Sequence, residues 1–367
     1  MKNKLGFWEN LKELLIASAL LCVFFLVIAI FFPSSSNTEK WMLGPAIAAG
    51  GRNPAWSPDG SQIAFQCEYY HQSDFLDPDV WDDPTWTPPR EICIYSLNSG
   101  NIRRITYGRF KGLPVWSNDG SQLAWHNINE TITIWDTKWH VVVRTIPDIG
   151  NPEDYQSVCK NFTLTARFQE LPSPCLKTME KDLENVSWSM DGKNVAYTKS
   201  VPNDNDSETP HFLFIQQDDE IIYQSRIPVM EFSSPPRWSP DGTILSWQPD
   251  DENTDYAFTF RTTGETILVE GDHYPEVYWS PSGTKIALID LGNIEIQGIR
   301  FTTNPFSYEI TYKIRYDIYK RTGGRAVNLS WSPDEKYIVY ELMLNPYDHQ
   351  IWILDIESGE QTLVLKQ

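Results

Sequence analysis

The pentapeptide WSPDG occupies residues 56–60 of the 367-residue chain. Close copies begin at five further tryptophans, which are Trp116, Trp188, Trp238, Trp279 and Trp331. The last two copies depart from the pattern, with Ser282 in place of the aspartate and Glu335 in place of the glycine. Successive copies are 41 to 72 residues apart. Self-similarity at this spacing is the signature of a repeat architecture.

Each copy predicts a tight β-hairpin turn. Proline presets φ at the second position of a turn, aspartate bonds to nearby backbone, and glycine accepts a positive φ. This order suits a type I turn followed by a left-handed residue. An apolar run such as QIAFQ at 62–66 follows each turn, and its central residue is smaller than its neighbours. We expect these smaller residues to let strands pack closely against the next sheet: Ala64, Ala124, Ala196, Ser246, Ala287 and Val339.

A second hairpin follows most of the copies. Examples are 92–106, 257–270 and 351–365, which turn at Asn98–Gly100, Thr263–Gly264 and Ser358–Gly359. The long β-rich stretch 293–320 is harder to divide into strands. Four short strands in each unit predict an all-β, six-bladed β-propeller over 50–367, in which every unit supplies its own four strands. The alternatives are a β-sandwich and an open array of hairpins.

The repeat also has a family likeness. WSPDG, an apolar run and an IYxxDxxSG-type hairpin together resemble the TolB-like propeller repeat, which is a WD40-like repeat. A similar repeat builds the propeller domain of the prolyl-oligopeptidase and dipeptidyl-peptidase IV families. The resemblance covers about 50–367 and implies the six-bladed fold, but it says little about function because this fold carries many unrelated activities.

An apolar segment precedes the repeats. Residues 14–32 are uncharged, and nineteen helical residues would span about 28 Å, enough to cross a bilayer. The alternative is a cleaved signal peptide, but the run is long and Phe31-Phe32-Pro33 is a poor cleavage site. The lysines of 1–13 place that segment in the cytoplasm. We therefore predict a single-pass transmembrane helix at 14–32, a linker at 33–49 and an extracytoplasmic propeller.

Charge and cysteines fit this location. The formal net charge is −19, which disfavours nucleic acid and anionic membrane surfaces as partners of the propeller and favours solubility. Cys22 lies in the predicted anchor, and four cysteines remain. Their spacing favours the disulfides Cys67–Cys93 and Cys159–Cys175 among three possible pairings, and four buried thiols are the alternative.

Motifs that would indicate catalysis are missing from the sequence. It contains no GxSxG, Walker loop, GxGxxG or HExxH. We therefore predict a protein that is not an enzyme and needs no cofactor. Acidic residues could hold Ca²⁺ only weakly, because no cluster has the spacing of a calcium loop. The candidates are Asp77, Asp79 and Asp82, then Asp204, Asp206 and Glu208, then Asp250, Asp251, Glu252 and Asp255.

The functional hypothesis rests on the long loops that connect some of the predicted strands. Turns between first and second strands, and between third and fourth strands, are short, so the insertions should gather at the opposite face, where loops on a rigid scaffold carry recognition. The 68–90 loop is the main candidate because it is rich in aromatic residues, which dominate binding interfaces. We predict a membrane-tethered scaffold for a protein, peptide or glycan, and an enzyme with its site in the central funnel is the alternative. The candidate binding residues are Tyr69, Tyr70, Phe75, Trp81 and Trp86.

Overall fold

A computed structural model describes most of the repeat region. The chain divides into two units, Met1–Ala46 with Tyr69–Thr87, and Ile47–Glu68 with Pro88–Gln367. The second unit holds nearly all of the described residues, and the fold is that of this unit. The described residues are 46–70, 90–106, 112–127, 131–146, 183–189, 193–201, 210–217, 220–230, 234–271, 273, 275–303, 306–346 and 348–364.

These residues form six antiparallel sheets of four strands, numbered here in chain order. Sheet 1 contains β1 (Ala46–Trp56), β2 (Gln62–Tyr70), β3 (Arg90–Ser96) and β4 (Asn101–Arg104). Sheet 2 contains β5 (Val115–Trp116), β6 (Gln122–His126), β7 (Ile132–Asp136) and β8 (Val141–Ile146). Sheet 3 contains β9 (Leu183–Trp188), β10 (Asn194–Ser200), β11 (His211–Gln217) and β12 (Glu220–Gln224).

The remaining three sheets repeat this plan. Sheet 4 contains β13 (Arg237–Trp238), β14 (Ile244–Trp247), β15 (Thr254–Phe260) and β16 (Thr266–Glu270). Sheet 5 contains β17 (Glu276–Trp279), β18 (Lys285–Asp290), β19 (Asn293–Thr303) and β20 (Phe306–Tyr316), followed by the short helix α5 (Ile318–Thr322). Sheet 6 contains β21 (Arg325–Trp331), β22 (Tyr337–Asn345), β23 (Asp348–Asp355) and β24 (Gln361–Leu363).

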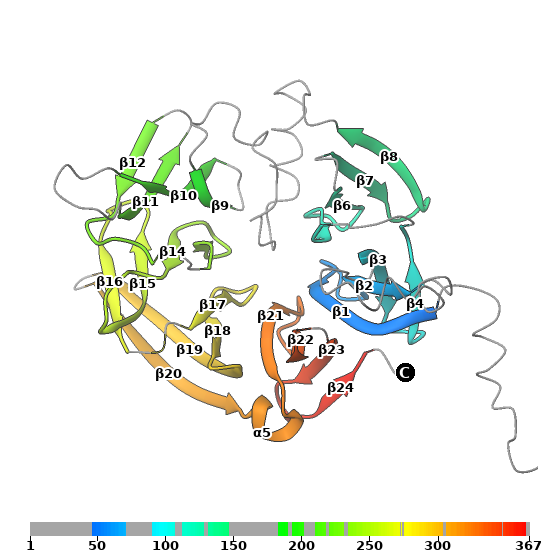
Figure 1. Cartoon of the computed structure of the whole chain (residues 1–367). Helices are drawn as coiled ribbons and strands as arrows, with labels where there is room; N and C mark the ends of the chain where they lie inside the picture. The colour runs from blue at the N-terminus through cyan, green and yellow to red at the C-terminus, as the bar shows by residue number, and fades with distance from the viewer. Residues whose placement is uncertain are drawn as a thin grey trace, which may run out of the picture. The chain divides into compact units, whose positions relative to one another are not determined.

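Strands within each sheet follow chain order, so every sheet is built from one repeat. This confirms, for the described residues, that each unit supplies its own four strands. Within the second unit, the first strands β1, β9, β17 and β21 lie innermost, and the fourth strands β8, β12, β16, β20 and β24 lie outermost (Figure 1). The outermost strands β8, β12 and β20 are mostly exposed, whereas the second and third strands of the sheets supply most of the buried core.

The WSPDG turns have the expected geometry. In the first copy, the Gly60 amide donates to the Ser57 carbonyl at 2.9 Å, and Gly60 takes a φ of 72°. The Asp59 carboxylate accepts from the Ser57 hydroxyl at 2.6 Å and from the Ser61 amide at 3.0 Å. These contacts explain why serine, aspartate and glycine recur at fixed places. Burial opposes ionisation of Asp59, but the hydrogen bonds from Ser57 and Ser61 outweigh it and lower the pKa of its carboxyl.

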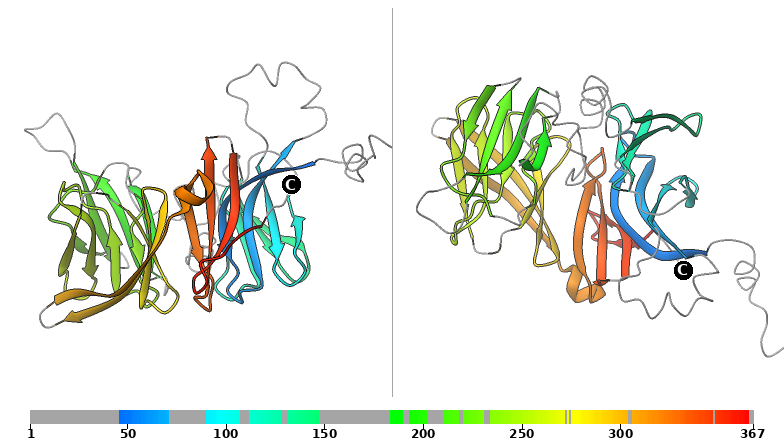
Figure 2. Two further views of the ribbon diagram at one scale, coloured as in Figure 1. Left: turned by 90° about the horizontal axis from the view of Figure 1, so that it is seen from below. Right: turned by 45° about the horizontal axis from the view of Figure 1, so that its top comes forward.

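Turns of neighbouring sheets touch. A Cβ atom built at the glycine of one turn would lie 3.4–3.5 Å from the turn of a neighbouring sheet. Sheets 5 and 6 use a different contact, in which the Ser282 amide donates to the Glu335 carboxylate at 2.6 Å. The tight turns of sheets 1, 2, 4, 5 and 6, and Ser189 of sheet 3, therefore lie at corresponding ends. Figure 2 shows the sheets from two further directions. The glycine contacts are Gly60 with Pro333, Gly120 with Pro58, Gly242 with Ser189 and Gly283 with Pro240.

The repeat tryptophans join successive sheets. Trp116 is 3% exposed, and its indole Nε1 donates to the Ala55 carbonyl of sheet 1 at 3.1 Å. In each such bond the acceptor is the residue immediately before the tryptophan of the preceding sheet. The sequence marks these tryptophans as repeat positions, but it does not reveal this hydrogen bond. The other bonds of this kind are Trp238 to Ser187, Trp279 to Arg237 and Trp331 to Tyr278, each 3.1 Å long.

Apolar clusters fill the spaces between sheets. One cluster joins sheets 1 and 2, a second joins sheets 3 and 4, a third joins sheets 4 and 5, and a fourth joins sheets 5 and 6. Sheets 6 and 1 also pack closely, because a Cβ atom at Gly51 would lie only 2.5 Å from the Ile351 side chain. The predicted small positions all lie in this interior, with Ala64, Ala196 and Ala287 fully buried.

The start of β1 and the elements within 293–320 differ from the expectation, and the predicted transmembrane segment lies outside the described residues. Strand β1 begins at Ala46, within the range predicted as linker, because Ala46–Gly50 continue the strand without a break. The stretch 293–320 resolves into the long hairpin β19–β20 and helix α5, and the sequence did not predict this helix. The predicted transmembrane segment 14–32 lies outside the described residues, and none of the described helices is long and apolar enough to cross a membrane.

Candidate functional site

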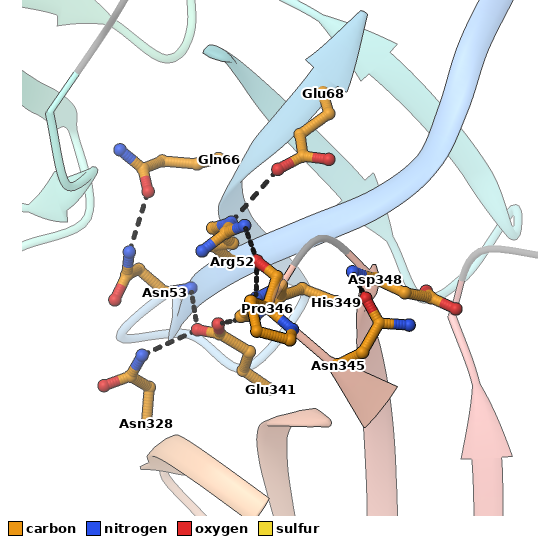
Figure 3. A network of polar contacts seen from close by, with 10 residues as sticks. All are labelled: Arg52, Asn53, Gln66, Glu68, Asn328, Glu341, Asn345, Pro346, Asp348 and His349. Atoms are coloured by element: carbon orange, nitrogen blue, oxygen red, sulfur yellow. Dashed lines mark hydrogen bonds and ion pairs between the residues drawn. The ribbon is translucent and has the colours of Figure 1, made fainter. Parts of the chain in front are cut away.

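A network of polar side chains joins sheets 1 and 6 (Figure 3). Its members lie on β1, β2, β21, β22 and β23, and we call it the junction network. Unpaired charges and polar groups are costly to bury, so the contacts of the buried members decide what the site does. Gln66, Glu68, Glu341 and His349 are each at most 4% exposed. The side chains of the network are Arg52, Asn53, Gln66, Glu68, Asn328, Glu341 and His349.

Two asparagines occupy equivalent places in the network. Asn53 and Asn328 each lie three residues before the tryptophan of their sheet, and each has a φ of 51°. Asparagine tolerates this left-handed conformation better than most residues do. The Asn53 Nδ2 donates to Gln66 Oε1 at 2.7 Å, and the Asn328 Nδ2 donates to Glu341 Oε2 at 2.6 Å. Both acceptors lie ten residues after their tryptophan, so sheets 1 and 6 repeat one arrangement.

Glu341 carries this arrangement across the junction. Its Oε2 also accepts the backbone amide of Asn53 in sheet 1 at 2.9 Å, and its Oε1 lies 2.6 Å from His349 Nδ1. The other ring nitrogen of His349 lies 3.1 Å from the Pro346 carbonyl. Carboxylate and carbonyl oxygens only accept, so His349 satisfies both when each of its ring nitrogens carries a proton. Glu341 and His349 then form a buried ion pair.

A second ion pair lies at the same junction, and its arginine also reaches across to sheet 6. Arg52 Nε donates to Glu68 Oε1 at 3.0 Å within sheet 1, and Arg52 Nη2 donates to the Pro346 carbonyl of sheet 6 at 3.3 Å. Pro346 therefore receives donors from Arg52 and from His349. Arg52 thus lies beside the carboxylate of Glu68, as His349 lies beside that of Glu341.

The junction network is built to hold two sheets together. Both oxygens of Glu341 accept donors from the protein, and these donors come from both sheets. A residue bonded in this way fixes the position of sheet 1 against sheet 6, because moving either sheet would leave a buried carboxylate short of donors.

These residues are not among the predicted site residues, although the sequence contains a signal for them. Only the first and last copies of the repeat combine an asparagine three residues before the tryptophan with Gln or Glu ten residues after it. In the other four copies, the residues at these two positions are Leu113 and His126, Asn185 and Thr198, Pro235 and Gln248, and Glu276 and Ile289.

Most of the predicted site residues fall outside the part of the chain that the structure describes. Tyr69 and Tyr70 end β2, and their side chains are not described. The remaining aromatic candidates and the first calcium candidates lie outside the described residues: Phe75, Trp81, Trp86, Asp77, Asp79 and Asp82. The second calcium candidates, Asp204, Asp206 and Glu208, lie outside them as well. Among the residues that the structure describes, which include Asp250, Asp251, Glu252 and Asp255, no group of three or more side chains could hold a metal ion.

One of the two predicted disulfides is present. Cys67 of β2 and Cys93 of β3 are bonded, with their Cα atoms 5.8 Å apart. The two strands pair antiparallel, with Phe65 opposite Cys93 and Cys67 opposite Glu91. The bond therefore joins neighbouring strands of sheet 1 near the start of the 71–89 connection. Cys159 and Cys175 lie outside the described residues.

Fold and junction together define the class of protein, a β-propeller built from WSPDG repeats. Among the described residues, four-stranded meanders pack face to face from sheet 1 to sheet 2 and from sheet 3 through to sheet 6, and side-chain bonds connect the first sheet to the last. The chain is similar in structure to a chain of the mitotic checkpoint complex, with a TM-score of 0.52 and 14% identity over 85% of this chain and 94% of that one. At this identity the similarity shows a shared fold alone.

Two further solved structures are more distant matches. TolB from Acinetobacter baumannii has a TM-score of 0.42 and 13% identity, over 85% of this chain and 77% of TolB. An acylaminoacyl peptidase in complex with Z-Gly-Gly-Phe-chloromethyl ketone has a TM-score of 0.41 and 12% identity, over 87% of this chain and 46% of the peptidase. No protein-family model matches the chain. No curated protein matches it.

Proposed function

We propose that this protein is a membrane-anchored, six-bladed β-propeller that displays a non-catalytic binding scaffold outside the cytoplasm. Its ligand is a protein, peptide or glycan bound by the long connections. The observation that carries the proposal is the unequal length of the connections at the two ends of the sheets. Connections between first and second strands and between third and fourth strands have two to five residues, whereas the others have two to 36.

A further observation supports a closed ring. Contacts join sheets 1 to 2, 3 to 4, 4 to 5, 5 to 6 and 6 to 1 among the described residues. Closure of the ring then needs only the junction between sheets 2 and 3, which are consecutive in the chain and linked by residues 147–182. A closed ring would give the connections a rigid support, and rigid support reduces the entropy lost on binding.

Replacing 71–89 by a short Gly/Ser turn in the full chain tests the binding role of this connection. The matched control lengthens the β15–β16 turn at 261–265, which lies at the tight-turn end. We expect proteins or peptides captured by the wild-type chain to be lost with the shortened connection and kept by the control, with both variants melting like wild type. Capture unchanged in the shortened variant would contradict the proposal.

Deleting 14–32 is expected to release the protein from the membrane fraction.

A further inference from the structure

The outer strand of sheet 2 presents apolar side chains to solvent. Trp139, in the turn before β8, is 69% exposed, and Val141, Val142 and Val143 of β8 are 49%, 56% and 49% exposed. These residues, with Lys138 and Arg144, are called the β8 edge. A run of three exposed valines is unusual on a soluble protein, because native edge strands are normally short, charged or covered. The β8 edge therefore needs a physical explanation.

The β8 edge is open along one side and apolar on both faces. Strand β8 ends the order of sheet 2, so in the described residues only β7 pairs with it. Val141 pairs with Asp136, and Val142 pairs with Trp135, so these two valines lie on opposite faces of the sheet. The register shifts next to them, which leaves Val143 as an extra residue. A flat surface would cover only one face, whereas an added strand covers the backbone edge and shields side chains on both faces.

The charge of the β8 edge is opposite to that of the whole chain. The formal net charge is −19, yet the hairpin segment 137–146 contains Lys138 and Arg144 and no acidic residue. The corresponding segments of sheets 3 and 6, 218–224 and 356–363, contain acidic residues and no lysine or arginine. Like-charged residues would meet if two copies of β8 paired with each other. An acidic segment would instead find complementary charge.

A neighbouring strand extends this basic surface. Arg103 of β4 lies 5.4 Å above the Trp135 ring, and its Nη2 lies 3.2 Å from His140 Nδ1 in the β7–β8 turn. His140 in turn stacks on Trp135, with ring centroids 5.4 Å apart. These contacts fix the turn that carries Lys138 and Trp139. The basic groups thus have a defined position at the start of β8.

We infer that the β8 edge binds an extended, acidic segment of a partner protein, which adds to sheet 2 as a fifth strand. Main-chain hydrogen bonds to β8 supply part of the affinity, and the valines and basic side chains select β-branched and acidic residues. The β8 edge belongs to the outer strands and not to the connections between second and third strands. Failure of this inference therefore leaves the proposed function standing, and the reverse also holds.

Peptide binding to the purified full-length chain tests the inference. The probe is a fluorescent peptide of about twelve residues that alternates Glu with Val or Thr, long enough to span a strand of ordinary length. Two matched peptides carry Lys in place of Glu, or N-methyl groups on alternate amides that block strand pairing. The protein variants are Val142→Asp and Arg144→Glu, and the control is Ile221→Asp on β12, where Ile221 is 59% exposed.

We expect the acidic peptide to bind, and its affinity to fall at least about tenfold, or roughly 1.4 kcal/mol, with either matched peptide and with either β8 variant. Ile221→Asp should leave binding unchanged, and amide hydrogen exchange should slow in β8 on binding. Equal binding of the acidic and basic peptides, or equal losses in the β8 and β12 variants, would overturn the inference. So would binding to phosphatidylserine vesicles without peptide binding, or a dimer that Val142→Asp dissociates without any peptide binding.

Discussion

The indole N–H of the repeat tryptophan makes a contribution that can be separated from its bulk. Trp116 and Trp56 are about equally buried, but only Trp116 donates to a carbonyl, and the Trp56 Nε1 has no partner among the described residues. Trp116→Phe and Trp56→Phe lose similar apolar area. We expect Trp116→Phe to cost about 1–3 kcal/mol more, because it leaves the Ala55 carbonyl unpaired. Chemical denaturation followed by circular dichroism measures the difference, and equal costs would contradict the prediction.

The turn aspartates make stability depend on pH. The backbone amide of Ser121 and the hydroxyl of Ser117 lower the pKa of Asp119 from its ordinary value of 3.8. A folded-state pKa below the unfolded value means that the ionised group stabilises the folded protein above the ordinary pKa. This stabilisation is lost as the pH falls through the folded value. The hydroxyl of Ser332 similarly lowers the pKa of Asp334.

Asp119→Asn tests this linkage. Near neutral pH we expect the variant to be less stable by about 1 kcal/mol, since the hydrogen bonds to the charged group are partly screened by solvent. The difference from wild type should shrink as the pH falls below 3.8, because wild-type Asp119 then becomes protonated as well. Denaturation at a series of pH values measures it. The control is Asp317→Asn, in an exposed ion pair with Arg315, and a difference that persists unchanged at low pH would refute the prediction.

Two departures from the repeat pattern form one interaction between elements. Glu335 replaces the turn glycine of sheet 6 and adopts a φ of 57°, which is strained for a residue with a side chain. Its carboxylate accepts the Ser282 amide at 2.6 Å and lies 2.9 Å from Lys285 Nζ in sheet 5. An aspartate at 282 would place a second carboxylate beside Glu335. Serine at position 282 avoids repulsion between two carboxylates, and this explains why it accompanies Glu335.

A double-mutant cycle measures this coupling. Ser282→Asp alone should destabilise the protein by about 1 kcal/mol through repulsion between the two carboxylates. In a Glu335→Gly background, the same substitution restores the common WSPDG turn, so it should be neutral or stabilising. We expect a coupling free energy above about 0.5 kcal/mol from the four denaturation midpoints. Additive effects would show that the two turns do not interact.

Some elements of this fold can be predicted from the sequence and others cannot. Turn types and strand order follow from local chemistry, because Pro, Asp and Gly act within a few residues of themselves. Helix α5 was missed because it is five residues long, too short for a periodic pattern. The junction network was missed because Glu341 and Asn53 are 288 residues apart, and only the closing of sheet 6 on sheet 1 brings them together.

At the scale of the molecule, the junction network connects the two ends of the repeat array. Glu341→Gln removes the charge and leaves a single acceptor oxygen for three donors. We expect a cost of about 3 kcal/mol and faster amide exchange in β1, β2, β21 and β22. The control is Glu309→Gln, whose partner Arg300 is also exposed, so its ion pair should contribute less than about 0.5 kcal/mol. Faster exchange spread evenly over all six sheets would argue against a local role.

In each of the tryptophan hydrogen bonds, the acceptor is synthesised before the donor. Trp116, Trp238, Trp279 and Trp331 each donate to the sheet that precedes them, so each repeat leaving the ribosome finds its acceptor already synthesised. No described sheet precedes that of Trp56, and its equivalent acceptor would lie at Ser330, in the last of the six described sheets to be synthesised. The array can thus grow by docking each new repeat on a finished one, and the final joining of sheet 6 to sheet 1 uses side-chain contacts in place of an indole bond.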